Sequence, residues 1–136
     1  MGLVHTEITL KNAFDVGNAA HGNIEEKNIR QKTVKALVDT GAGTLIINEA
    51  LREELGLEIR GEKRVSLANN AKEACKISGP VEIQWRNRSC TVQPLVLPGA
   101  EKVLLGAIPL QDMDLIVDPN RHELIGAHGD EVVCYV

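Results

Sequence analysis

Apolar and polar residues alternate along much of the chain, in short runs separated by turn-forming residues. Residues 4–10 and 81–86 alternate with a period of two, which is typical of a strand with one buried face. Further strands are expected at 33–38, 44–47, 65–67, 90–97, 103–105, 115–117, 123–125 and 132–136. Many short strands with a turn signal after each predict an all-β fold, a small barrel or a sandwich.

One segment has the signals of a helix. Asn48 suits an N-cap, Glu49 favours the positive helix end, and Leu51 and Leu55 lie on one face. Gly56 fits the C-terminal stop. We therefore expect one short helix in the β fold, with a short helical turn at 109–113.

Two connections can also be predicted. The stretch 15–28 contains Gly, Asn and Ala and indicates a long surface loop between the first two strands. Asn69 and Asn70 tolerate positive φ and predict a hairpin turn, and Asn87-Arg88 is expected to form another turn.

Length and charge exclude several classes of protein. The 136 residues predict a single domain, 1–136, with an aliphatic core because the chain has one Trp, one Tyr and one Phe. The net charge of −4 comes from scattered charges, so we expect no nucleic-acid partner. No apolar run approaches the about 20 residues that span a bilayer, so we expect no membrane partner.

The three cysteines, Cys75, Cys90 and Cys134, are odd in number and form no C-x-x-C motif. They indicate reduced thiols and a cytoplasmic location, and we expect no secretory signal before the first strand. Residues 1–6 satisfy a loose myristoylation pattern. The alternation of residues 4–10 favours a strand over an acylated terminus.

The segment with the strongest chemical signal is Ala36 to Ala42, in which Asp39 directly follows an apolar strand. Thr40 and Gly41 come next, and the chain then returns to small and apolar residues. A turn with apolar residues on both sides is expected to be buried, and a buried aspartate is costly unless it is paired. Perturbed carboxylates cluster at active sites, so Asp39 is a candidate catalytic residue.

Val38-Asp39-Thr40-Gly41-Ala42 resembles the active-site signature of the retroviral-type aspartic peptidases, the retropepsin-like family. The similarity extends over about residues 34–118, through the helix, a flap-like hairpin at about 65–77, and Leu104-Leu105-Gly106. This resemblance implies a small closed β-barrel and an aspartic endopeptidase that needs no cofactor and no metal. It also implies that Leu104, Leu105 and Gly106 support the catalytic loop from beneath.

The family's chemistry needs two carboxylates that share a proton, one acting on a water and the other on the substrate carbonyl. This chain has a single D-[ST]-G, since Asp15-Val16-Gly17 lacks the hydroxyl. The resemblance therefore implies a homodimer with one Asp39 from each chain. Thr40 would grip the partner's loop, Gly41 would allow close approach, and Ala42 would lie beside an extended peptide substrate.

The flap departs from the retroviral pattern because its tip, Ala68-Asn69-Asn70-Ala71, contains no glycine. These four residues are candidate substrate contacts. The family's terminal strands contribute to its dimer interface, and the segments 4–10 and 132–136 are candidates for that role, with ordinary edge strands as an equal alternative.

The sequence is also compatible in part with three other functions. A retropepsin-like domain used for dimerisation or peptide binding, with little or no proteolysis, remains open. A phosphate-binding turn of the actin-like ATPases is disfavoured because that fold needs two large lobes. His122 and His128 resemble H-E-x-x-H, but their i,i+6 spacing does not allow both to bind one zinc ion. They and the aspartates at 112 and 114 are expected at the surface.

Overall fold

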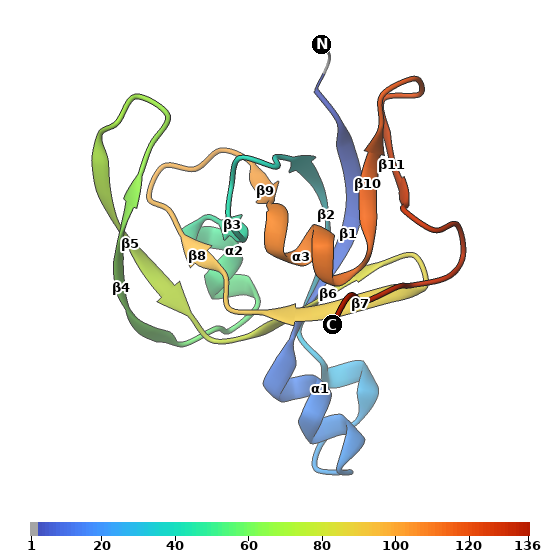
Figure 1. Cartoon of the computed structure of the whole chain (residues 1–136). Helices are drawn as coiled ribbons and strands as arrows, with labels where there is room; N and C mark the ends of the chain where they lie inside the picture. The colour runs from blue at the N-terminus through green and yellow to red at the C-terminus, as the bar shows by residue number, and fades with distance from the viewer. Residues whose placement is uncertain (1–2) are drawn as a thin grey trace.

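The computed structural model describes residues 3–136, so Gly2 of the acylation pattern lies outside the described chain. Fifteen elements follow one another within these residues, and Figure 1 shows how the helices and strands are arranged. They are β1 (His5–Asn12), α1 (Ala13–Ala20), η1 (Glu26–Asn28), β2 (Gln31–Val38), β3 (Leu45–Ile47), α2 (Glu49–Glu54), β4 (Ile59–Ser66), β5 (Lys72–Ser78), β6 (Val81–Trp85), β7 (Arg88–Val92), β8 (Leu95–Val96), β9 (Val103–Leu105), α3 (Ala107–Asp112), β10 (Leu115–Asp118) and β11 (Glu123–Gly126).

Nine of the strands form one curled sheet in the order β4-β5-β8-β3-β9-β2-β1-β6-β7, and β10 and β11 form a separate pair. The mostly β fold is confirmed. The sheet is a half-barrel and not the closed barrel that we expected, because β4 and β7 lie at its two edges and do not pair with each other.

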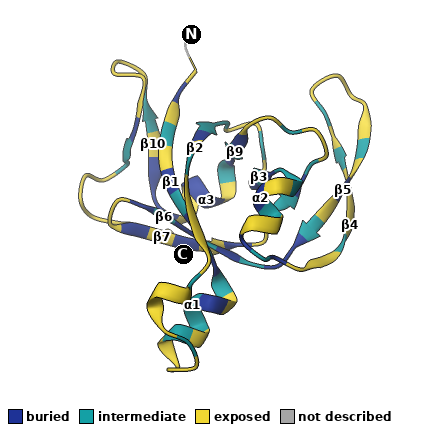
Figure 2. Ribbon diagram, turned by 180° about the vertical axis from the view of Figure 1, so that it is seen from behind, coloured by how far each residue is buried: buried dark blue, intermediate teal, exposed yellow. Residues whose placement is uncertain are grey.

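The inner face of the sheet carries an aliphatic core, in agreement with the low aromatic content. Its fully buried side chains include Ile8, Leu45, Ile83 and Leu105, and Trp85 is the one aromatic residue in the cluster. Figure 2 shows these buried positions on the central strands, a mixture of exposed and half-buried positions on α1, and exposed positions on the tip of the β4–β5 hairpin. The hydrophobic contribution to stability therefore comes mainly from the packed strands and not from α1 or the hairpin tip.

The expected helix after Asn48 and the expected helical turn at 109–113 correspond to α2 and α3, but α1 was not expected. Helix α1 occupies the segment expected to be a loop. The Asn12 side chain accepts a hydrogen bond from the Asp15 backbone N–H and caps this helix. The Asp15 carboxylate in turn holds Arg30 at 2.8 and 2.9 Å, so polar side chains stabilise a segment with little apolar pattern.

Three strand predictions also need correction. The segment 132–136 forms no strand, and β1 is no edge strand because it pairs with both β2 and β6. The strand expected at 90–97 is divided into β7 and β8 by Gln93 and Pro94, since proline cannot donate to a ladder. Arg88, expected in a turn, is the first residue of β7 and pairs with Trp85.

Candidate active site

The loop that follows β2 is held by backbone hydrogen bonds from two later elements. β2 pairs with β9 in parallel, and the Asp39 N–H donates to the Leu105 carbonyl at 3.0 Å. The first residues of α3 then bind the far side of the loop. Ala107 N–H donates to the Ala42 carbonyl at 2.8 Å, and Ile108 N–H donates to the Gly43 carbonyl at 3.0 Å. The sequence-predicted groups 39–42 and 104–106 therefore lie in direct contact.

Gly106 makes this contact sterically possible. A Cβ at this position would lie 2.3 Å from the Thr44 carbonyl oxygen and 2.5 Å from that of Ala42. Both atoms belong to backbone, so they cannot rotate away as a flexible side chain would. A glycine is therefore required where β9 passes beneath the Asp39 loop.

The Asp39 carboxylate lies at the surface of the single chain. Its Oδ1 atom accepts a hydrogen bond from Gly41 N–H at 2.9 Å. Asp39 is half-buried, while Thr40 and Gly41 are exposed and Leu45 is fully buried. The expected burial of this turn was therefore wrong for one chain, because its apolar neighbours form the floor of the loop and leave its outer side open.

The β4–β5 hairpin corresponds to the predicted flap. Asn70 has a φ of 64°, as its predicted turn requires. The tip is closed by its own bonds, from Leu67 N–H to the Ala71 carbonyl at 2.8 Å and from Ala71 N–H to the Asn69 Oδ1 atom at 3.0 Å. All four tip residues, 68–71, are exposed. Their role in binding substrate stays a prediction.

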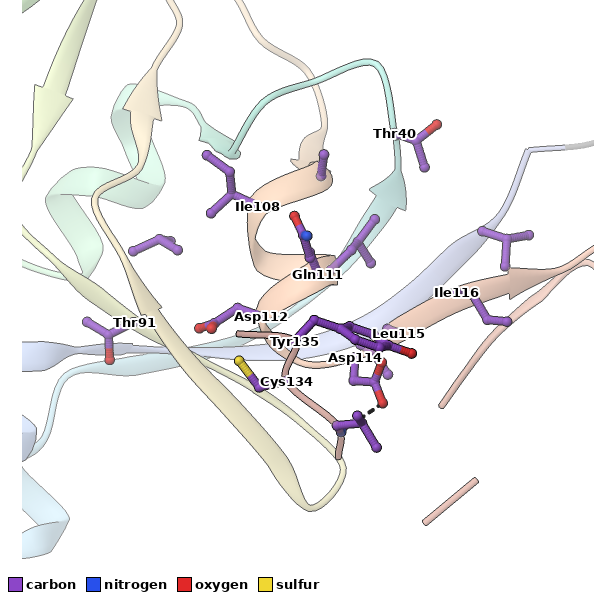
Figure 3. Close-up of a pocket in the computed structure, with 15 residues that line it drawn as sticks. Thr40, Thr91, Ile108, Gln111, Asp112, Asp114, Leu115, Ile116, Cys134 and Tyr135 are labelled. Atoms are coloured by element: carbon purple, nitrogen blue, oxygen red, sulfur yellow. Dashed lines mark hydrogen bonds between the residues drawn. The ribbon is translucent and has the colours of Figure 1, made fainter. Parts of the chain in front are cut away.

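A pocket of about 810 Å³ lies beside the loop and was missed by sequence reasoning. Its walls come from β7, α3, β10 and the C-terminal segment, as Figure 3 shows. Thr40 is part of its lining, but Asp39 and the flap tip are not. The pocket thus adjoins the candidate site and does not contain the carboxylate. Its walls come from elements distant in sequence, so no local signal marks it.

Comparison with known proteins decides the family. A family model described as "gag-polyprotein putative aspartyl protease" matches residues 26–112, which is more than half of the chain. This chain belongs to that family. The matched segment of this aspartyl protease family member includes the Asp39 loop, the flap hairpin and all of α3.

A solved structure has the same fold. The retroviral protease-like domain of Ddi1 from Leishmania major matches with a TM-score of 0.55 and 17% identity, over 91% of this chain and 87% of that one. At this identity the match shows that the retropepsin-like fold is shared. Among curated proteins, no sequence matches this family member.

Asp114 is a second carboxylate that sequence reasoning placed wrongly, since it is buried and not at the surface. Its Oδ2 atom lies 2.7 Å from the His128 Nδ1 atom and accepts the Val133 N–H at 3.0 Å. These hydrogen bonds, that of His128 first, lower the pKa of Asp114 below its usual value. The Tyr135 hydroxyl lies 3.2 Å from the His128 Nε2 atom. The C-terminal segment is thus attached through side chains.

The remaining candidate groups are the metal-ligating side chains and the thiols. Within residues 3–136, no cluster of three His, Cys, Asp or Glu side chains is arranged to hold a metal. Burial raises the pKa of the Cys90 thiol to about 12 and also raises that of Cys75, whereas Cys134 is exposed. None of the helices in the described chain has the length and apolar character to traverse a bilayer.

Proposed function

We propose that this chain is one subunit of an aspartic endopeptidase and that Asp39 supplies half of its catalytic pair. The other half comes from Asp39 of a second copy. One carboxylate removes a proton from a water while the other, protonated, donates a hydrogen bond to the substrate carbonyl. The substrate is an extended peptide that lies between the paired loops and the flaps and adds to the sheet through main-chain bonds.

The observation that carries this proposal is the contrast between the backbone of the Asp39 loop and its carboxylate. The backbone is fixed from below by Leu105, Ala107 and Ile108. Within the described chain, the carboxylate makes one hydrogen bond, to the N–H of its own loop. A catalytic acid needs this combination, because its position must be defined while its oxygens remain available to a water and a partner.

The first test replaces Asp39 by asparagine, which has the same shape and cannot ionise. We expect Asp39→Asn to lower kcat/KM for peptide cleavage by at least about a hundred-fold, the usual contribution of a general acid or base. Sedimentation should show the same dimer for both proteins. Asp130→Asn, which alters an exposed aspartate in the C-terminal segment, is the matched control and should cleave normally.

A mixing experiment tests the shared pair itself. Excess Asp39→Asn subunits, exchanged into the wild-type protein, should remove activity in proportion to the loss of wild-type homodimers, because a mixed dimer has only one aspartate. Activity that stays proportional to the amount of wild-type chain would contradict the two-chain site.

The second candidate function is a dimerisation or peptide-binding module with little or no proteolysis. The accessible flap and the exposed Thr40 are equally consistent with a binding module and with an endopeptidase. A wild-type dimer that binds peptides and cleaves none between pH 3 and 8 would support it. The three free thiols support a reducing, cytoplasmic setting for either function.

A further inference from the structure

Arg88 is a buried cation outside the candidate site. It begins β7 and is 5% exposed. Burying a charge is costly unless hydrogen bonds compensate for the lost water. Its Nη1 atom donates to the carbonyls of Met113 and Asp114, both at 2.9 Å, and its Nη2 atom donates to the Gly129 carbonyl. Within residues 3–136, its Nε atom is buried without a partner.

Two of the three carbonyls that Arg88 binds lie at the C-terminal end of α3. Met113 and Asp114 directly follow α3, whose last carbonyls have no partner within the helix. A cation at this end of a helix is also favoured by the helix dipole. Gly126 allows the guanidinium to approach, since a Cβ there would lie 2.3 Å from Nη2. Arg88 therefore fixes the C-terminal end of α3 and joins it to the chain that follows β11.

The opposite end of α3 holds the Asp39 loop. Ala107 and Ile108 are its first two residues, and their N–H groups bind the carbonyls of Ala42 and Gly43. Between the two ends, Leu110 is buried in the core. Helix α3 has only six residues, so a shift at one end is transmitted to the other through fewer than two turns.

We propose that Arg88 is a positioning residue for the Asp39 loop and acts through α3. By fixing the C-terminal end of the helix, it fixes the two N–H groups that hold the loop carbonyls. The effect of Arg88 on catalysis rests on the proposed function, whereas the structural connection from Arg88 through α3 to the loop does not. A side chain that only filled space would be replaced by an apolar residue at little cost. Removal of Arg88 instead takes a donor from the carbonyls of Met113 and Gly129, while the Asp114 carbonyl keeps the Ala127 N–H at 2.8 Å.

The test compares Arg88→Lys with Arg86→Lys. Lysine keeps the charge but cannot reproduce the planar fork of donors. Arg86 lies two residues earlier, in the exposed turn, with its guanidinium 4.5 Å from the centroid of the Trp85 ring, so it provides the matched control. In Arg88→Lys we expect amide hydrogen exchange at Ala107 and Ile108 to rise roughly tenfold, the effect of losing one net hydrogen bond. Amides shared by β1 and β2 should stay at wild-type rates, as should all amides in Arg86→Lys.

Kinetics distinguish positioning from general destabilisation. Arg88→Lys should lower kcat roughly tenfold and leave KM within about twofold, because the loop is displaced while the flap is not. A rise in KM with unchanged kcat, or unchanged exchange at Ala107 and Ile108, would overturn the proposal.

A second variant removes a contact at the N-terminal end of α3, where the helix binds the Asp39 loop. Ala107→Pro places proline at the first helical position, which tolerates it, and removes the N–H that binds Ala42. If Arg88 acts through α3, Arg88→Lys should lower kcat by a smaller factor in the Ala107→Pro background than in the wild type, because one of the two contacts that it positions is already lost. Additive effects would contradict the route through α3.

The outcomes also separate this inference from the proposed function. If Arg88→Lys does not fold, the test of the inference rests on Ala107→Pro alone. An unchanged kcat in Ala107→Pro then overturns the inference. If the wild type cleaves no peptide, the proposed function fails, while the exchange rates at Ala107 and Ile108 still test the link.

Discussion

The Asp39 loop and the flap are both connections between strands, but the chain holds them in different ways. The loop lies over fully buried Leu45 and Leu105, and its carbonyls are bound by the first turn of α3. The flap tip is exposed, and its bonds are made within the hairpin itself. Local stability follows buried contacts and shared hydrogen bonds. The chain thus fixes the backbone beneath the candidate acid and leaves the candidate cover loosely attached.

The strongest test of this comparison changes Gly106. A methyl group there would press on the carbonyls of Ala42 and Thr44, and backbone overpacking of this kind costs about 3 kcal/mol. We expect Gly106→Ala to lower the free energy of unfolding in urea by that amount and to abolish cleavage. Gly43→Ala alters the same loop where a Cβ meets nothing within 4 Å, and it should be nearly neutral. Equal costs would show that steric pressure beneath the loop is not its main constraint.

A smaller effect is expected at the flap. Asn70 adopts a φ of 64°, which costs an ordinary L-residue about 1 kcal/mol. Asn70→Ala should therefore destabilise the hairpin by about that amount, measured by hydrogen exchange of the β4–β5 amides, with exchange at the Asp39 amide unchanged. Asn70→Gly should have almost no effect on the same amides. If either variant alters the loop, the two regions are coupled and the comparison fails.

The smallest expected effect is on the stability of the folded chain at low pH. The pKa of Asp114 is lowered in the folded chain from its ordinary value of 3.8. Its contribution to stability is therefore fully present above about pH 4 and is lost as the pH falls through the lowered folded value. We expect Asp114→Asn to flatten the decline in the urea midpoint between pH 4 and pH 2.5. If the urea midpoint of the variant fell with pH as steeply as that of the wild type, other carboxylates would cause the loss of stability in acid.

The sequence predicted those parts of the fold that neighbouring residues decide. Asn48 caps α2 by accepting the Leu51 N–H at 2.9 Å, Gly56 has a φ of 64° after that helix, and Asn70 turns the flap. The aliphatic core and the contact between the loop and residues 104–106 also agree with the expectation. In each case the signal lies within a few residues or in a motif with fixed spacing.

The predictions failed where a side chain depends on a distant partner. The helix α1 needs Asp15 and Arg30, and its Gly and Asn content suggested a loop. Arg88 resembled a turn residue because its three acceptors lie at least 25 positions further along the chain. Asp114 resembled a surface residue because His128 is 14 positions away. Sequence patterns report burial and local caps, but they do not report which polar groups meet across the fold.

The segment between β1 and β2 has a practical consequence. It leaves and re-enters the sheet at one point, where Asn12 N–H donates to the Arg30 carbonyl at 2.9 Å. Figure 1 shows α1 at the end of the molecule opposite the flap and the Asp39 loop. Ala20, at the exposed end of α1, is therefore a suitable anchor for a fluorophore. Energy transfer between two labelled copies would report subunit exchange in real time with both loops and both flaps unmodified.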